Sequence, residues 1–232
     1  MKNFKIYAMG LAMAGALSFT SCADDYLDTA PTDAVSNVTI AQNMESLYLG
    51  LNGIHRQMIS QESGYQCMGG LGGMMYIMDI EADDITWITN TWMKAAYLGW
   101  QCNTNESNGY NTVFWRLYYQ WIMNANGLLE VLENTDVAAL SGSDKALYEQ
   151  IKGEALMFRA FSHFQAVQTY ADAYKAGGGN SQPGVPYRTV ENRNDGELAR
   201  STVEETYAMI NADLAEACSL LEGKKITELN HW

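Results

Sequence analysis

Proline and basic residues are scarce in this chain of 232 residues. Its three prolines are too few for the many turns of a loop-rich all-β protein. Lysine and arginine number 14 against 27 aspartate and glutamate residues, which gives a net charge of -13. Because nucleic acids and anionic lipids attract basic surfaces, this charge argues against binding to either of them. The remaining composition, with 47% hydrophobic and 18% charged residues, is that of a chain that folds.

Motifs that support catalysis or metal binding are also missing. The sequence contains no H-E-x-x-H, no G-x-S-x-G and no phosphate-binding loop, and its three histidines lie far apart. No C-x-x-C pair occurs among the four cysteines, so zinc and dithiol redox sites have no support. Cys67 and Cys102 could pair in a disulfide, although nothing in their spacing requires it. We therefore expect a protein that is not an enzyme and that holds no metal or cofactor.

No hydrophobic run is long enough to cross a membrane, which takes about 20 residues. The N-terminal apolar run, residues 6–19, follows two lysines and is typical of a signal peptide. Residues 17–22 read Leu-Ser-Phe-Thr-Ser-Cys and resemble a bacterial lipobox, in which the chain is cut before a cysteine that is then acylated. We expect residues 1–21 to be the signal peptide, Cys22 to carry lipid, and residues 22–38 to form a polar tether. Ordinary secretion with a structural Cys22 is the alternative.

Apolar residues three and four positions apart predict four amphipathic helices in the rest of the chain. They are expected at Thr39–Ser60, Asn111–Asn134, Asp144–Tyr174 and Ser201–Leu221. Thr39 and Ser201 each begin a capping-box pattern, which marks the start of a helix. We expect the glycine-rich residues 60–73 to be a loop. Residues 74–105 fit no single period and are expected to form an irregular excursion between helices.

The third of these helices has two apolar stripes, so it should pack between neighbouring helices. This pattern predicts an all-α fold, a tetratricopeptide-like stacked helical array (an α-α superhelix) with long irregular excursions, over residues 39–222. Trp115 and Trp121 are expected in its core, and Arg159 and His163 in structural bridges between helices. The last helix should bury one face, made of Val203, Tyr207, Ile210, Leu214, Ala217 and Leu221.

The irregular excursion also carries the densest group of acids, which begins at Asp79 and Glu81, and three tryptophans. Its candidate ligand-binding residues are Asp83, Asp84, Trp87, Asn90, Trp92 and Trp100. Carboxylates and amides hydrogen-bond to sugar hydroxyls, and aromatic faces stack on the apolar faces of sugar rings. Three other interpretations of the acids are open. They are a solvated turn, a carboxylate pair for glycoside hydrolysis, and a calcium loop in which Asp84 occupies the position that requires glycine.

Three motifs in and after the third helix point to a family. Residues 153–160 read Gly-Glu-Ala-Leu-Met-Phe-Arg-Ala, and residues 183–186 read Pro-Gly-Val-Pro. Residues 201–207 read Ser-Thr-Val-Glu-Glu-Thr-Tyr and begin the last helix. In this order the motifs resemble the SusD/RagB family of outer-membrane lipoproteins from Bacteroidetes. The resemblance extends from residue 1 to about residue 222.

The resemblance implies a lipid-anchored protein that faces the cell exterior from the outer membrane. Such proteins bind a nutrient glycan, or in some cases a peptide, and pass it uncleaved to a SusC-like TonB-dependent transporter. Family members continue with a second half, which residues 223–232 do not resemble, so we expect a truncated chain. The alternatives are a helical scaffold that docks on the transporter without ligand contact, a lipid-anchored hydrolase, and a non-functional fragment.

Overall fold

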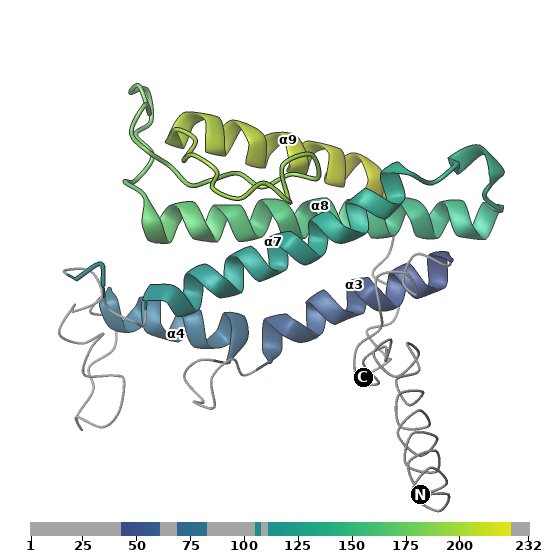
Figure 1. Cartoon of the computed structure of the whole chain (residues 1–232), viewed down its shortest axis with the longest axis horizontal. Coiled ribbons are helices and arrows are strands. Elements are labelled where there is room, and N and C mark those ends of the chain that lie inside the picture. The colour runs from purple at the N-terminus through teal and green to yellow at the C-terminus, as the bar shows by residue number, and fades with distance from the viewer. Residues whose placement is uncertain (1–42, 61–68, 83–104, 108–110, 224–232) are drawn as a thin grey trace, which may run out of the picture. The chain divides into compact units, whose positions relative to one another are not determined.

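The computed structural model describes residues 43–60, 69–82, 105–107 and 111–223, all of which belong to one compact unit, residues 41–232. This described part contains five α-helices and no strand (Figure 1). The helices are α3 (Met44–Ile59), α4 (Gly70–Glu81), α7 (Asn111–Glu133), α8 (Gly142–Tyr170) and α9 (Val203–Leu221), with a short 3-10 turn, η4 (Val137–Ala139), between α7 and α8. The predicted all-α fold is confirmed.

Helix α8 is the centre of the helical packing. It packs against α7, α9 and α3, while α3 also contacts α4. Helices α7, α8 and α9 follow one another in alternating directions (Figure 1). Both predicted stripes of α8 are buried, one including Ile151 and Ala155 and the other Ala160 and Val167. A helix with two apolar sides therefore lies between neighbours, as the sequence predicts.

Side chains cap the starts of α3 and α9, at Asn43 and Thr202. Helix α3 begins at Met44, and the side chain of Asn43 accepts a hydrogen bond from the backbone N–H of Ser46 at 2.8 Å. Helix α9 has a capping box made by Thr202 and Glu205. The predicted cap at Ser201 is therefore wrong by one residue, and Thr39 lies outside the described residues. Asn43 and Thr202 both accept from the backbone three positions ahead, which satisfies an N–H that no helical carbonyl reaches.

Helix α4 corrects the prediction that residues 60–73 are a loop and that an irregular excursion begins at residue 74. Gly70 to Gly73 are helical, and the helix continues to Glu81. Gly70 has a φ of 51°, and a Cβ there would lie 2.0 Å from the carbonyl oxygen of Met58. Only glycine fits this close approach to α3, so the glycines allow helix packing here instead of breaking a helix. Met74 and Ile77 then bury the inner face of α4.

The ends of α8 and the buried face of α9 also differ from expectation. Helix α8 stops at Tyr170, four residues before the predicted end, because Ala171 adopts an extended conformation. In α9, Leu214 is 36% exposed, whereas its neighbour Asp213 is buried. The apolar pattern assigned Leu214 to the core because it treated Asp213 as a surface residue, although Asp213 has a buried basic partner described below.

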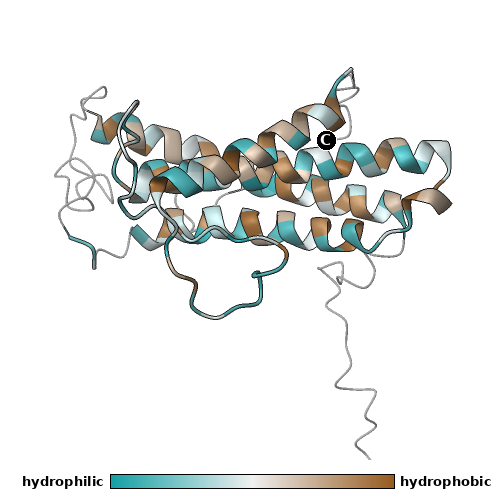
Figure 2. Ribbon diagram, turned by 90° about the horizontal axis from the view of Figure 1, so that it is seen from above, coloured by the Kyte–Doolittle hydropathy of each residue, from teal (hydrophilic) through white to brown (hydrophobic). Residues whose placement is uncertain are grey.

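The core lies between the helices, which alternate hydrophobic and hydrophilic residues along their lengths (Figure 2). Trp121 of α7 is fully buried, as predicted, and so is its neighbour Tyr118. Trp115 is 36% exposed, so its predicted place in the core is wrong. No helix in the described part of the chain has both the length and the apolar composition needed to cross a membrane.

Candidate functional site

The middle of α8 carries a buried salt bridge that joins three helices. The guanidinium of Arg159 donates two hydrogen bonds to the carboxylate of Asp213 on α9, from Nε and from Nη2, each 2.7 Å long. Its Nη1 donates to Oδ1 of Asn126 on α7 at 3.0 Å. Burial alone would lower the pKa of Arg159, but the hydrogen bonds and charge of Asp213 raise it overall. Arg159 therefore stays charged and ties α8 to both neighbours.

His163, one turn further along α8, completes this buried cluster. Its Nδ1 donates to the carbonyl of Arg159 at 2.8 Å, and its Nε2 accepts from the backbone N–H of Arg188 at 3.0 Å. The imidazole stacks on the ring of Tyr187, with 3.8 Å between centroids, and Tyr187 donates its hydroxyl hydrogen bond to Asp213 at 2.7 Å. Burial and the nearby Arg159 charge lower the pKa of His163 to about 3. The histidine is neutral and both its nitrogens are occupied, so the predicted structural role of Arg159 and His163 is confirmed.

Glu154, from the same sequence motif as Arg159, connects α8 to a third neighbour. Its Oε2 lies 3.0 Å from Nε2 of His55 on α3, and its Oε1 accepts from Gln150 at 2.9 Å. Burial would raise the pKa of Glu154, but the hydrogen bonds from His55 and Gln150 lower it overall. The motif in residues 153–160 thus places one acid toward α3 and one base toward α7 and α9. The motif therefore specifies helix packing, and its acid and its base are both engaged by neighbouring helices instead of by a ligand.

A cavity of about 950 Å³ lies at the opposite end of α8, where α4, α7 and the segment after α8 meet. Its lining residues are Met74, Ile77, Met78, Glu81, Glu106, Asn111, Phe114, Tyr118, Gln168, Thr169, Tyr170, Ala171, Asp172, Pro183 and Arg200. The lining combines buried apolar side chains, such as those of Met74 and Phe114, with exposed polar ones, such as those of Gln168 and Asp172. A concave apolar surface with a few polar groups is the usual form of a ligand-binding pocket.

Four polar side chains of the cavity differ from those of the Arg159 cluster in having no described partner. In the described part of the chain, the side chains of Glu81, Glu106, Gln168 and Asp172 form no hydrogen bond. Burial raises the pKa of Glu81, the acid at the end of α4. Within the described part of the chain, no neighbouring side chain occupies these oxygens and amide hydrogens, so they are available there to a ligand.

Arg200 has a different role, since it holds the cavity wall together. Its Nε donates to the carbonyl of Gly184 at 2.6 Å, and its Nη2 donates to the carbonyls of Tyr170 and Pro183, both at 3.0 Å. These three bonds join the end of α8 to the segment that follows it. Gly184 is itself required here, because a Cβ would lie 2.6 Å from Oγ1 of Thr206. The Pro-Gly-Val-Pro motif therefore shapes one wall of the cavity.

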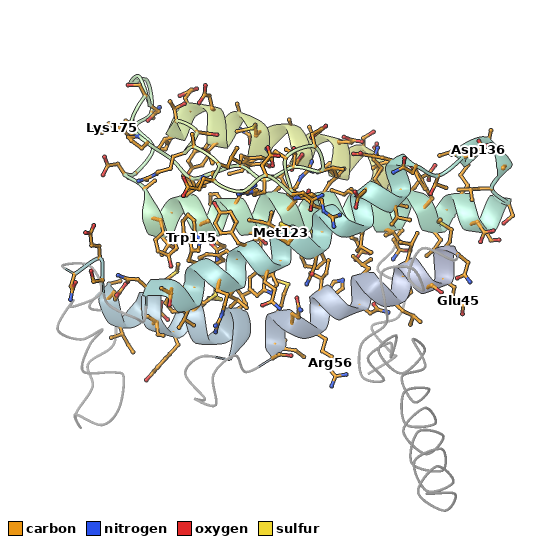
Figure 3. The ribbon with its side chains drawn as sticks, viewed as in Figure 1. Glu45, Arg56, Trp115, Met123, Asp136 and Lys175 are labelled. Carbon is orange, nitrogen blue, oxygen red and sulfur yellow. The ribbon has the colours of Figure 1, made fainter. Side chains whose placement is uncertain are left out.

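Aromatic rings form a second feature of the cavity wall. The hydroxyl of Tyr170 donates to the carbonyl of Asn111 at 2.6 Å, and its ring meets that of Tyr118 edge to face at 6.5 Å. The ring of Tyr170 also meets that of Trp115 edge to face, with 5.1 Å between centroids. Trp115 lies on α7 (Figure 3) and is not among the residues that line the cavity. Aromatic faces beside hydrogen-bonding groups suit a ligand with both apolar and hydroxyl-bearing surfaces.

The predicted site residues fall mainly in parts of the chain that are not described. Asp83, Asp84, Trp87, Asn90, Trp92 and Trp100 lie outside the described residues, as do Cys22, Cys67 and Cys102. Of the acid cluster, Asp79 and Glu81 lie in the last turn of α4, where Asp79 is exposed and Glu81 lines the cavity. Within the described ranges, no group of three histidine, cysteine or acidic residues could hold a metal ion.

Sequence reasoning missed the cavity residues at the end of α8 and after it. Gln168 and Asp172 stand at the end of a helix whose last turn was placed too late, and Arg200 precedes the cap of α9. The one available signal was the polar run that replaces the apolar stripes after Val167. That signal marks a helix end but does not show which other segments meet it.

Comparison with known proteins identifies the family. A SusD-like family model, described as starch-binding and associating with the outer membrane, matches residues 25–229. The chain belongs to the SusD-like family. A crystal structure of a SusD-like carbohydrate binding protein from Bacteroides vulgatus ATCC 8482 has the same helical fold, with a TM-score of 0.65 and 22% sequence identity. The match covers 82% of this chain and 38% of that protein, so the chain spans well under half of its SusD-like relative. No curated protein matches the chain.

Proposed function

We propose that this SusD-like chain is the glycan-binding part of a cell-surface lipoprotein that delivers its ligand, uncleaved, to a SusC-like TonB-dependent transporter. The observation that carries the proposal is the cavity at the end of α8, which combines aromatic rings with unpartnered acid and amide groups. The family's description as starch-binding and outer-membrane-associated supports the same ligand class and location. A peptide is the alternative nutrient ligand.

The six candidate residues predicted from the sequence lie in a segment that is flanked on both sides by described residues that reach the cavity. We therefore include these six residues in the proposed binding site. Helix α4 ends at Glu81, and Glu81 and Glu106 both line the cavity. The described residues on both sides of this segment therefore lie at the cavity. We propose that Asp83, Asp84, Trp87, Asn90, Trp92 and Trp100 contribute ligand contacts together with the cavity, by hydrogen bonding and by stacking on sugar rings.

Absence of catalysis is also part of the proposal. A glycosidase needs two carboxyl groups held about 5–10 Å apart on either side of the scissile bond. The three described acids of the cavity come from three separate segments, and the matching family is described as starch-binding. We propose that these acids accept hydrogen bonds from sugar hydroxyls.

Isothermal titration of the chain from residue 23 against malto-oligosaccharides, other neutral glycans and short peptides tests the ligand class. We expect a weak but saturable interaction with a glycan. Trp87→Ala, Trp92→Ala or Trp100→Ala should weaken it by roughly five- to 150-fold where the ring stacks on a sugar, by analogy with stacking on nucleotide bases. Ile59→Ala on α3, which removes an apolar side chain that is 68% exposed, is the matched control and should bind like the parent. Binding of none of these compounds would favour a docking scaffold instead.

Attachment to the membrane is a separate step of the proposal. We propose cleavage after residue 21, acylation of Cys22, a tether over residues 22–38, and an orientation toward the cell exterior. Stable anchoring takes at least two acyl chains, because one alone gives only marginal membrane residence. Mass spectrometry of the N-terminal peptide from the membrane fraction should show an acylated Cys22. An unmodified Cys22, or cleavage at another bond, would overturn this step and leave the ligand proposal standing.

A further inference from the structure

Acidic side chains outnumber basic ones in the described lining of the cavity. Three carboxylates line it, Glu81 at the end of α4, Glu106 before α7 and Asp172 after α8. The lining contains a single basic side chain among the described residues, that of Arg200. The described lining of the cavity is therefore negative, in agreement with the chain's net charge of -13.

Arg200 does not present its side chain as an anion-binding group. Its Nε and Nη2 already donate to the carbonyls of Gly184, Tyr170 and Pro183. The bidentate geometry by which arginine normally binds a carboxylate uses two parallel N–H groups of this kind. With those donors committed to the backbone, a carboxylate or sulfate on a ligand would find no bidentate partner here.

The acids, by contrast, are free to accept hydrogen bonds. Glu81, Glu106 and Asp172 have no partner among the described residues. Gln168 adds an amide that both donates and accepts, and it too is unpartnered there. This set matches hydroxyl groups, which donate to carboxylates, and amino groups, which also carry a compensating positive charge.

We propose that this cavity selects uncharged or amine-bearing glycans and rejects glycans that carry carboxylate or sulfate groups. The inference rests on the proposed glycan-binding function and names the chemical class of its ligand. An anionic sugar placed in the cavity loses water, meets like charge from three segments and gains no bidentate basic partner among the described residues. A neutral sugar of the same shape keeps its hydroxyl contacts without that repulsion.

The test uses glycans that share a backbone and differ only in charge. Maltohexaose and cellohexaose are each titrated in three forms: unmodified, oxidised to the carboxylate at C6, and aminated at C6. The chain from residue 23 should bind the amino form at least as tightly as the unmodified glycan. It should bind the carboxylated form roughly ten-fold more weakly at low salt, as expected for like charges about 12 Å apart near a protein surface. The difference should shrink at about 0.5 M salt, because salt screens the repulsion.

Two variants locate the effect in the cavity. Glu81→Gln with Asp172→Asn should bring the affinities of the carboxylated and unmodified glycans closer, by several-fold. Glu222→Gln, at the exposed end of α9 and away from the cavity lining, is the matched control and should leave the difference unchanged. Equal or tighter binding of a carboxylated glycan at low salt would overturn the inference alone, as would a difference that the double variant leaves intact. Failure of all six glycans to bind would instead overturn the proposed function.

Discussion

Helix α8 carries two polar regions that differ in how their groups are satisfied. Around Arg159 and His163, every side-chain nitrogen has a protein partner, and His163 is fully buried while the Arg159 side chain is 11% exposed. At the end of the same helix, Gln168 and Asp172 are exposed and form no hydrogen bond within the described chain. A satisfied, buried cluster fixes one packing of the helices, whereas an unsatisfied polar rim around a cavity remains available to a ligand.

The contrast shows why residue type alone does not mark a site. A histidine beside an arginine and an aspartate is a common catalytic combination, yet burial keeps His163 neutral and both its nitrogens are used. The acids of the cavity have no such supporting network. Stability and binding should therefore respond to different substitutions on one helix.

The largest expected effect comes from Arg159→Met. Removal of the guanidinium leaves the carboxylate of Asp213 buried without its charge partner, which typically costs about 3–5 kcal/mol of unfolding free energy. Urea unfolding followed by circular dichroism measures the loss. Arg159→Met combined with Asp213→Leu should recover much of it, because the stranded charge is then gone. A single variant within about 1 kcal/mol of the parent would contradict a structural role for this cluster.

The second effect tests the cavity wall. Gly184→Ala places a Cβ 2.6 Å from Oγ1 of Thr206 and 2.9 Å from the carbonyl of Thr202. Crowding of this kind against backbone should cost up to about 3 kcal/mol of unfolding free energy. Gly179→Ala is the control, since a Cβ there meets nothing within 4 Å, and it should stay within about 0.5 kcal/mol of the parent. Equal urea midpoints for the two variants would show that the wall is not held as described.

The third effect is a pH dependence that belongs to the buried cluster. The pKa of His163 is about 3 in the folded chain against an ordinary 6.5, so only the unfolded chain takes up a proton between these values. Stability is complete above pH 6.5 and falls as the pH is lowered, by about 1.4 kcal/mol per unit. We expect a loss of about 2 kcal/mol between pH 6.5 and 5. Glu154, whose pKa is lowered from 4.5, adds its own loss only at lower pH.

His163→Gln serves as the control for this dependence. It should start from a lower stability at pH 7, because the buried contacts change, but its urea midpoint should vary less from pH 6.5 to 5. A variant with the same slope as the parent would assign the pH dependence to another group.

The smallest effect on stability should come from the rim of the cavity. Gln168→Ala with Asp172→Ala removes two exposed side chains that have no described partner, so the unfolding free energy should stay within about 0.5 kcal/mol of the parent. Loss of one or two hydrogen bonds to a ligand, each worth about 0.5–1.5 kcal/mol, should weaken maltohexaose binding several-fold. Unchanged binding together with unchanged stability would remove these two residues from the site.

The helices were largely predictable from sequence because their apolar spacing is regular. The observed α7 ends within one residue of its predicted end, and the two stripes of α8 correctly indicated a central helix. Helix α4 was missed because glycine's low helix propensity was taken to mean a loop, whereas Gly70 is required by its contact with Met58. Buried Asp213 was missed because its partner Arg159 is 54 residues away in the sequence.

The residues that line the cavity were harder to predict from the sequence. Its lining comes from α4, α7, α8 and the segment before α9, and each contributes only a few residues without a local motif. Glu81 was noticed as part of an acid cluster, but its proximity to Asp172 and Arg200 follows from helix packing. Spacing along a sequence predicts which residues share a helix face and does not predict which helix ends meet.

The position of the ligand is the central claim, and photocrosslinking tests it most directly. Maltohexaose carrying a diazirine is bound to the chain from residue 23, irradiated, and the labelled peptides are identified by mass spectrometry. The account predicts labels on residues 74–81, 111–118 and 168–172, which line the cavity, and their suppression by excess unlabelled maltohexaose. Labels confined to α3 or to the outer face of α9, or labels that excess glycan does not suppress, would contradict it.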